Sequence, residues 1–280
     1  MNNPIANYIR NIIYSSDKAS LHLLPCPTGI GKTYSTVIEI AELLIRKAKD
    51  GDWPDNAPKR IWFATDLIEN VTDAHRNLID IIESSDELSK EQKVDAVKYI
   101  DYIPSNADCM SKISSQELSE FFISIDLPQP KNIKKLHQEL EQLLALIELL
   151  KKDKNQPYGF FTSQQKRTQE LANQLYSRLL LAVRSHIQNF PEILELPKAQ
   201  SALSKVLPGV RIENDITKVI FCTTSKLLHG IDFKLFKYKP LLKETNSLFI
   251  IDEFDKQSRV ILDFLVDNKP IDILEEMRLV

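Results

Sequence analysis

Apolar residues recur along the first third of the chain at two different spacings. After Asn3 and Pro4, a good N-cap and first-turn pair, isoleucines follow at helical spacing and predict a short helix. The runs ASLHLLP and RIWFAT are short and apolar and predict buried strands, and each precedes a longer amphipathic segment. The order helix, strand, helix, strand, helix is typical of a parallel sheet covered by helices.

The strand pattern stops near residue 83 and resumes near residue 216. There KVIFCTT and SLFIIDEFD are short, apolar and rich in β-branched or aromatic residues, as buried parallel strands are. We therefore expect an α/β fold whose sheet domain, flanked by helices, is built from residues 1–83 and 216–280.

Residues 84–215 have the pattern of a large helical insertion. Leu136, Leu140, Leu143, Ile147 and Leu150 alternate by four and three positions, as in a coiled-coil seam, and a second run extends from Leu171 to Ile187. The two runs predict an antiparallel helical hairpin. It could bind a protein partner, or it could simply pack against the sheet domain.

One turn is unusually rich in glycine. The segment CPTGIGKT holds two of the chain's six glycines and lies between an apolar run and an amphipathic helix. Glycines let backbone N–H groups point at a polyanion, and a helix N-terminus adds its positive end. The pattern predicts a phosphate cradle, or P-loop, formed by Pro27, Thr28, Gly29, Ile30, Gly31, Lys32 and Thr33.

In this cradle Lys32 would bind the β- and γ-phosphates of ATP, and the Thr33 hydroxyl would bind Mg²⁺. The generic motif begins with glycine where this chain has Cys26, so a simple glycine turn is the alternative.

An ATP site needs a second part at the end of another strand, and LFIIDEFD supplies it. Four apolar residues precede Asp252, which predicts a carboxylate at the end of a buried strand, where Mg²⁺ is its natural partner. Glu253 could then orient or deprotonate the attacking water. The alternative is that Asp252 caps a helix and Glu253 lies in its first turn.

Composition narrows the classes of function. The chain has 280 residues and a net charge of −3, so contact with nucleic acid requires a local basic patch. Its three cysteines are scattered and form no CxxC pair, which fits a reducing, cytoplasmic setting and disfavours a cysteine-based metal site. No signal peptide and no run long enough to span a membrane is visible.

These segments resemble a known family. CPTGIGKT is similar to motif I of superfamily-two helicases, usually A-x-T-G-x-G-K-T, in which alanine is common where Cys26 stands. IIDEFD is similar to their DEAD/DEAH-type motif II. FATDLIENV and CTTSKLL stand where motifs Ia and Ib belong, and the resemblance covers roughly residues 1–83 and 216–266.

The resemblance implies a RecA-like P-loop NTPase fold and an ATP hydrolase that acts on nucleic acid. Thr65, Asn70, Thr224 and Lys226 would hold the backbone of single-stranded DNA or RNA. Short hydroxyl and amide side chains at strand ends suit phosphate contacts, although ordinary turn and N-cap chemistry would use the same residues.

Two departures from the family pattern matter. No glutamine precedes the P-loop, so no residue here argues for adenine. The chain also ends about thirty residues after motif II, which leaves no room for the family's second RecA-like lobe. We therefore expect the ATP-binding lobe of a longer enzyme. The alternative is a non-catalytic nucleotide-binding or protein-interaction module derived from such a lobe.

The tip of the predicted hairpin combines basic and aromatic residues. Lys151, Lys152, Lys154, Lys166 and Arg167 surround Tyr158, Phe160 and Phe161. Such a mixture suits the stacking and backbone contacts of single-stranded nucleic acid, and it equally suits a solvated turn whose aromatic side chains pack on the hairpin.

Overall fold

The computed structural model divides the chain into two compact units. The first comprises residues 1–103, 214–230 and 240–280, and the second comprises residues 104–213 and 231–239. The structure describes residues 4–14, 22, 31–124, 133–152, 158–190, 192, 196–207, 217–229 and 246–253.

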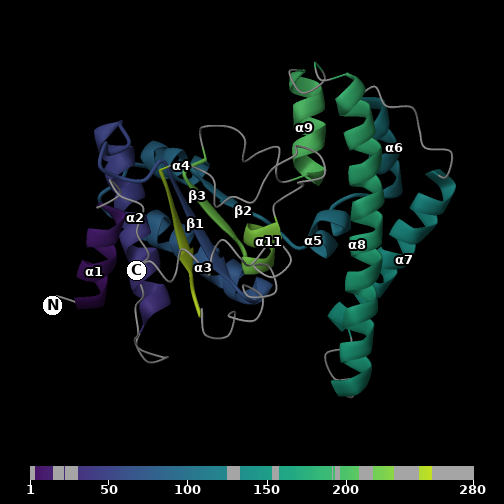
Figure 1. The fold of residues 1–280 in the computed structure, drawn as a ribbon, viewed down its shortest axis with the longest axis horizontal. Helices are drawn as coiled ribbons and strands as arrows, with labels where there is room; N and C mark the ends of the chain where they lie inside the picture. Colours follow the sequence, from purple (N-terminus) through teal and green to yellow (C-terminus); the bar gives the residue numbers. More distant parts are fainter. Residues whose placement is uncertain are drawn as a thin grey trace, which may run out of the picture. The chain divides into compact units, whose positions relative to one another are not determined.

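The first unit is an α/β unit whose four described strands form one parallel sheet in the order β2-β3-β1-β4 (Figure 1). The strands are β1 (Arg60–Thr65), β2 (Ile100–Tyr102), β3 (Val219–Thr223) and β4 (Ser247–Ile251). Helices flank them, namely α1 (Pro4–Ile13), α2 (Lys32–Asp50), α3 (Ile68–Ser84), α4 (Lys90–Lys98) and α11 (Thr224–His229). The predicted α/β class and parallel sheet are confirmed.

The central strand β1 explains why this sequence forms a sheet. All six of its residues are buried, as expected for a strand covered on both faces. Ile61 lies opposite Val219 on one side and Leu248 on the other. Ile61 and Phe63 belong to one apolar cluster with Val37 of α2 and Leu78 of α3, and α3 contacts both β1 and β3, so helices cover this face of the sheet.

The boundary between sheet and insertion lies later than the sequence pattern predicts. We expected the helical insertion to begin at residue 84, but α4 packs on α2 and α3, and β2 pairs with β3. The first unit therefore extends to Ile103. The strand β2 has only three residues, all half-buried, and is too short to give a recognisable alternation.

The second unit is helical in all of its described elements. It contains α5 (Asn106–Ser111), α6 (Ser115–Ser124), α7 (Ile133–Lys152), α8 (Tyr158–Asn189) and α9 (Pro197–Val206). Only residues 153–157 separate α7 from α8, and the two helices contact each other, so they run antiparallel.

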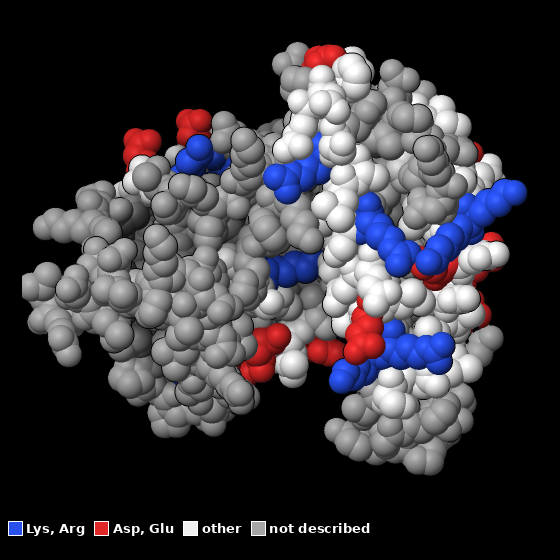
Figure 2. Space-filling model, turned by 45° about the vertical axis from the view of Figure 1, so that its right-hand side comes forward, with Lys and Arg blue, Asp and Glu red and all other residues white. Residues whose placement is uncertain are grey.

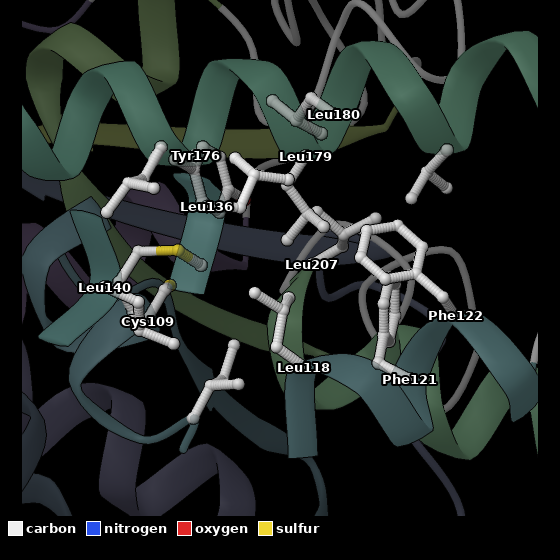
Figure 3. Packing of buried hydrophobic residues seen from close by; sticks show 14 of the residues in the cluster. Cys109, Leu118, Phe121, Phe122, Leu136, Leu140, Tyr176, Leu179, Leu180 and Leu207 are labelled. Carbon is white, nitrogen blue, oxygen red and sulfur yellow. The ribbon is translucent and has the colours of Figure 1, made fainter. Parts of the chain in front are cut away.

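The core of the second unit follows the predicted seam. Leu136, Leu140 and Leu143 of α7 are buried in one cluster with Leu175 and Leu179 of α8. Figure 3 shows Leu136, Leu140 and Leu179 directed toward the same space, with Leu118, Phe121 and Phe122 of α6 nearby. The four-and-three spacing of the leucines is therefore the packing seam of this unit.

An ion pair joins α1 to α2. The Arg10 guanidinium donates through Nε to Glu39 Oε2 at 2.7 Å and through Nη2 to Oε1 at 2.9 Å. The Glu39 side chain is only 3% exposed, whereas that of Arg10 is 51% exposed. The hydrogen bonds to Glu39, followed by its charge, raise the pKa of Arg10. The buried carboxylate thus has a bidentate partner that reaches in from the surface.

We predict that Arg10→Gln lowers the free energy of unfolding by about 1–3 kcal/mol, because it leaves the Glu39 carboxylate buried without its cation. The double variant with Glu39→Gln should recover part of that loss, since no buried charge remains. Urea unfolding of the three proteins measures both effects. An equal loss in the single and double variants would show that Glu39 does not depend on Arg10.

Candidate functional site

A hydrogen bond joins the start of α2 to the end of β4. The Thr33 hydroxyl donates to Oδ2 of Asp252, across 219 positions of sequence. Strand alternation explains the contact. Leu248 and Ile250 pack in the cluster that contains the α2 side chains, so Asp252, two residues farther, faces the helix that begins at Lys32. The structure thus brings together the two predicted halves of the site.

Gly31 forms the N-terminal boundary of α2 in a left-handed conformation. Its φ is 79°, and its carbonyl accepts the first helical hydrogen bond from the Ser35 N–H at 2.8 Å. A Cβ at this position would meet no atom within 4 Å, so the backbone angle, not lack of space, requires glycine. The predicted cradle residues Pro27, Thr28, Gly29 and Ile30 lie outside the described residues.

Glu253 follows Asp252 in a conformation that non-glycine residues rarely adopt. Its φ is 53°, and its N–H donates to Oδ1 of Asp252 at 3.0 Å. The Asp252 N–H itself donates to the Ala64 carbonyl at 2.9 Å, so the ladder with β1 continues up to Asp252. The Oε2 atom of Glu253 is buried. A strained backbone at a strand end is a feature that clusters at functional sites.

The end of β1 is organised around a carboxylate that the sequence analysis missed. Oδ1 of Asp66 accepts hydrogen bonds from the Thr65 hydroxyl at 3.2 Å, the Leu67 N–H at 2.7 Å and the Asn70 side-chain amide at 3.2 Å. Thr65 is 1% exposed. Thr65 and Asn70, which were predicted to contact phosphate, therefore donate to Asp66 instead. The sequence feature that could have indicated this role is an aspartate just before a helix.

The two threonines at the end of β3, Thr223 and Thr224, lie in different environments. The Thr223 hydroxyl accepts from the Lys226 N–H at 3.4 Å, which is a capping contact in α11. Thr224 is 2% exposed, and its hydroxyl has no hydrogen-bond partner among the described residues. A buried hydroxyl is poorly placed to contact a phosphate. Of the two residues predicted here to bind a nucleic-acid backbone, Thr224 is thus buried and Lys226 is partly exposed.

Cys222 lies beside these threonines and is fully buried. Burial raises the pKa of its thiol to about 12, against a smaller opposing effect of the Lys226 charge. The thiol is therefore protonated at neutral pH and unsuited to nucleophilic catalysis.

The first unit also has a cleft of about 370 Å³ that none of these residues lines. Its lining includes Arg10, Glu39, Arg46, Lys49 and Glu87. Its lining lies beyond the first turn of α2, and Arg10 and Lys49 are paired with Glu39 and Glu87. We therefore place the candidate site at the strand ends and not in this cleft.

Mg²⁺ is the metal that suits the contact between Thr33 and Asp252. Within the described ranges, no group of three or more His, Cys, Asp or Glu side chains could hold a metal ion. Mg²⁺ does not need such a group, because it is usually bound by one or two carboxylates together with phosphates and water. A hydroxyl and a carboxylate oxygen within hydrogen-bonding distance fit that requirement.

Comparison with known proteins gives this chain no family. No protein-family model matches it, and no curated protein resembles it closely enough to count as a match. In the described part of the chain, no helix has the length and apolar character needed to cross a bilayer.

We predict that Glu253→Gly is more stable than Glu253→Ala by about 1 kcal/mol, because alanine keeps the left-handed strain that glycine relieves. Asn246 has a φ of 62° and serves as the control. Asparagine tolerates this region, so Asn246→Gly should raise the free energy of unfolding by less than Glu253→Gly does. Urea denaturation of the variants decides the matter, and equal stability of the two Glu253 variants would contradict the strain.

The two threonines at the end of β3 should respond in opposite directions to valine. Thr224→Val should stabilise the protein by about 1 kcal/mol, because it removes a buried hydroxyl without changing the shape. Thr223→Val should destabilise it by about 0.5 kcal/mol, because it removes a cap. Thermal unfolding monitored by circular dichroism tests the pair, and a loss of stability in Thr224→Val would mean that the hydroxyl has a partner.

Proposed function

We propose that Lys32 and Thr33 at the start of α2, together with Asp252 and Glu253 just after β4, form a site for Mg-ATP. The observation that carries this proposal is the hydrogen bond between Thr33 and Asp252. A hydroxyl directly after a lysine at a helix start and an aspartate at the end of a buried strand are the two protein oxygens expected on a P-loop Mg²⁺. Ligands of open parallel sheets bind at the carboxyl ends of the strands, where this pair lies.

Each residue has a definite role in the proposed site. Lys32 is half-buried in the first turn of α2, where its ammonium and the N-terminal end of the helix both favour phosphate. Thr33 and Asp252 would hold Mg²⁺, which neutralises charge on the phosphates. Glu253 would accept a proton from the attacking water, and its backbone conformation fixes where its carboxylate lies.

We further propose that this unit is a RecA-like ATP-binding lobe of a helicase-like, nucleic-acid-dependent ATPase. The support is the resemblance of CPTGIGKT and IIDEFD to helicase motifs I and II, together with the parallel sheet and the hydrogen bond between Thr33 and Asp252. In this proposal a second RecA-like lobe, elsewhere in a longer enzyme, would complete the site for hydrolysis.

We predict that Lys32→Ala weakens the binding of Mg-ATP about tenfold or more, because it removes a cation that faces the triphosphate in a partly desolvated site. Lys49→Ala is the matched control, since it removes a cation from the other end of the same helix. Titration calorimetry with the 280-residue chain gives both affinities.

The same titrations test the role of Mg²⁺. Chelating Mg²⁺ with EDTA should weaken ATP binding to the wild type. In Asp252→Asn, the affinities with and without Mg²⁺ should be nearly the same. Two results would overturn the proposed site: wild-type protein that does not bind Mg-ATP, or equal affinities for wild type and Lys32→Ala. Binding without turnover in the complete enzyme would instead favour the non-catalytic module.

A further inference from the structure

The long helix α8 carries a charge opposite to that of the whole protein. Between Ser163 and Asn189 it has four Lys or Arg side chains, Lys166, Arg167, Arg178 and Arg184, and a single carboxylate, Glu170. The complete chain has 39 acidic and 36 basic residues, so this excess is local. A local basic surface is what an acidic protein needs to bind a polyanion.

Helical geometry places the four cations on the side of α8 away from the core. The buried residues of the helix, which include Thr168, Leu175 and Val183, form its packed side. Lys166 and Arg184 are eighteen positions, or about five turns, apart, which is about 27 Å along the helix axis. Arg167 and Arg178 are about three turns apart, so the cations form two neighbouring rows.

Apart from Glu170, the rest of this face is neutral and rich in hydrogen-bond donors. Asn173, Gln174, Ser185 and Gln188 are all exposed. Leu181, which is 52% exposed, is the one large apolar side chain between Ser163 and Asn189 that is described as exposed, and it offers too little apolar surface for a membrane contact. Amide and hydroxyl groups between arginines are the usual partners of phosphate and sugar oxygens.

Three of the four cations are available to a ligand. Arg178 donates to Glu139 of α7 and is thereby partly neutralised. Lys166, Arg167 and Arg184 form no ion pair with any described residue of the chain. Lys166 and Arg167 are exposed, and Arg184 is half-buried. In the space-filling view, Lys and Arg side chains lie across the described face of the helical unit, with some Asp and Glu side chains beside them (Figure 2).

We propose that the exposed face of α8 binds the phosphate backbone of single-stranded nucleic acid. Its cations extend over a length that spans several nucleotides of an extended strand. Arginine matches phosphate geometrically, and the neutral donors between the cations add contacts that do not depend on base sequence. The proposal concerns the helical unit alone and does not depend on ATP binding at the sheet.

The test compares two triple variants of the full chain with equal changes in charge. Lys166→Gln, Arg167→Gln and Arg184→Gln together neutralise the α8 face. Lys112→Gln, Lys134→Gln and Lys135→Gln neutralise three exposed cations elsewhere in the same unit. Fluorescence anisotropy with labelled oligothymidylate and oligouridylate, without nucleotide and at several salt concentrations, gives the affinities. Circular dichroism confirms that both variants keep the helical content of the wild type.

The wild type and the control variant should bind with the same steep salt dependence. The α8 variant should bind about tenfold more weakly at low salt, and its salt slope should be lower by about 2, at about 0.7 for each lost phosphate contact on a single strand. Equal losses in the two variants, or no binding by the wild type, would overturn the proposal. Equal competition by polyglutamate would do so as well, because it would indicate an acidic protein partner. Because these titrations contain no nucleotide, and the two variants differ from the wild type only in the helical unit, the result is separate from the ATP site.

Discussion

The parallel pairing of β1 with β3 and β4 is the constraint on which the candidate site depends. In sequence, β1 lies more than 150 positions from β3 and β4, and the common direction of the three strands brings their carboxyl ends to one edge of the sheet. The hydrogen bond from Asp252 to Ala64 continues that pairing beyond β4. The position of the Asp252 carboxylate is therefore set by the backbone ladder, and α2 needs only to present Thr33 to it.

This edge of the sheet concentrates features that cost stability. Glu253 has a left-handed backbone, and Thr224 has a buried hydroxyl without a described partner. The apolar body of the sheet compensates, since every residue of β1 and most of β3 are buried. Residues that lower the stability of the fold, gathered at the strand ends beside a well-packed core, are the arrangement expected of a functional site.

The elements that the sequence predicted well are those with a strong period. RIWFAT, KVIFCTT and the start of SLFIIDEFD are strands, and the leucine seams lie in α7 and α8, because burial on one or both faces imposes a pattern of apolar residues. The short strand β2 was missed because three half-buried residues impose no such pattern. The contact between Thr33 and Asp252 was predictable only from the chemistry of a Mg-ATP site, which needs both oxygens, since spacing along the chain contains no information about a pairing over 219 positions.

The side-chain roles were harder to predict than the elements, because a hydroxyl or amide at a strand end has several possible partners. Thr65 and Asn70 donate to Asp66, and this choice depends on a neighbouring carboxylate that no periodicity reveals. The same carboxylate bears on function. Asp66, Asp252 and Glu253 are three carboxylates at the strand ends, so in the proposed function this part of the sheet would suit phosphates that arrive with Mg²⁺ better than a bare phosphate backbone. The α8 surface, with one carboxylate among four cations, would have the opposite preference. The two proposals thus assign different phosphate chemistry to the two units, a metal-bound triphosphate to the sheet unit and a nucleic-acid backbone to the helical unit.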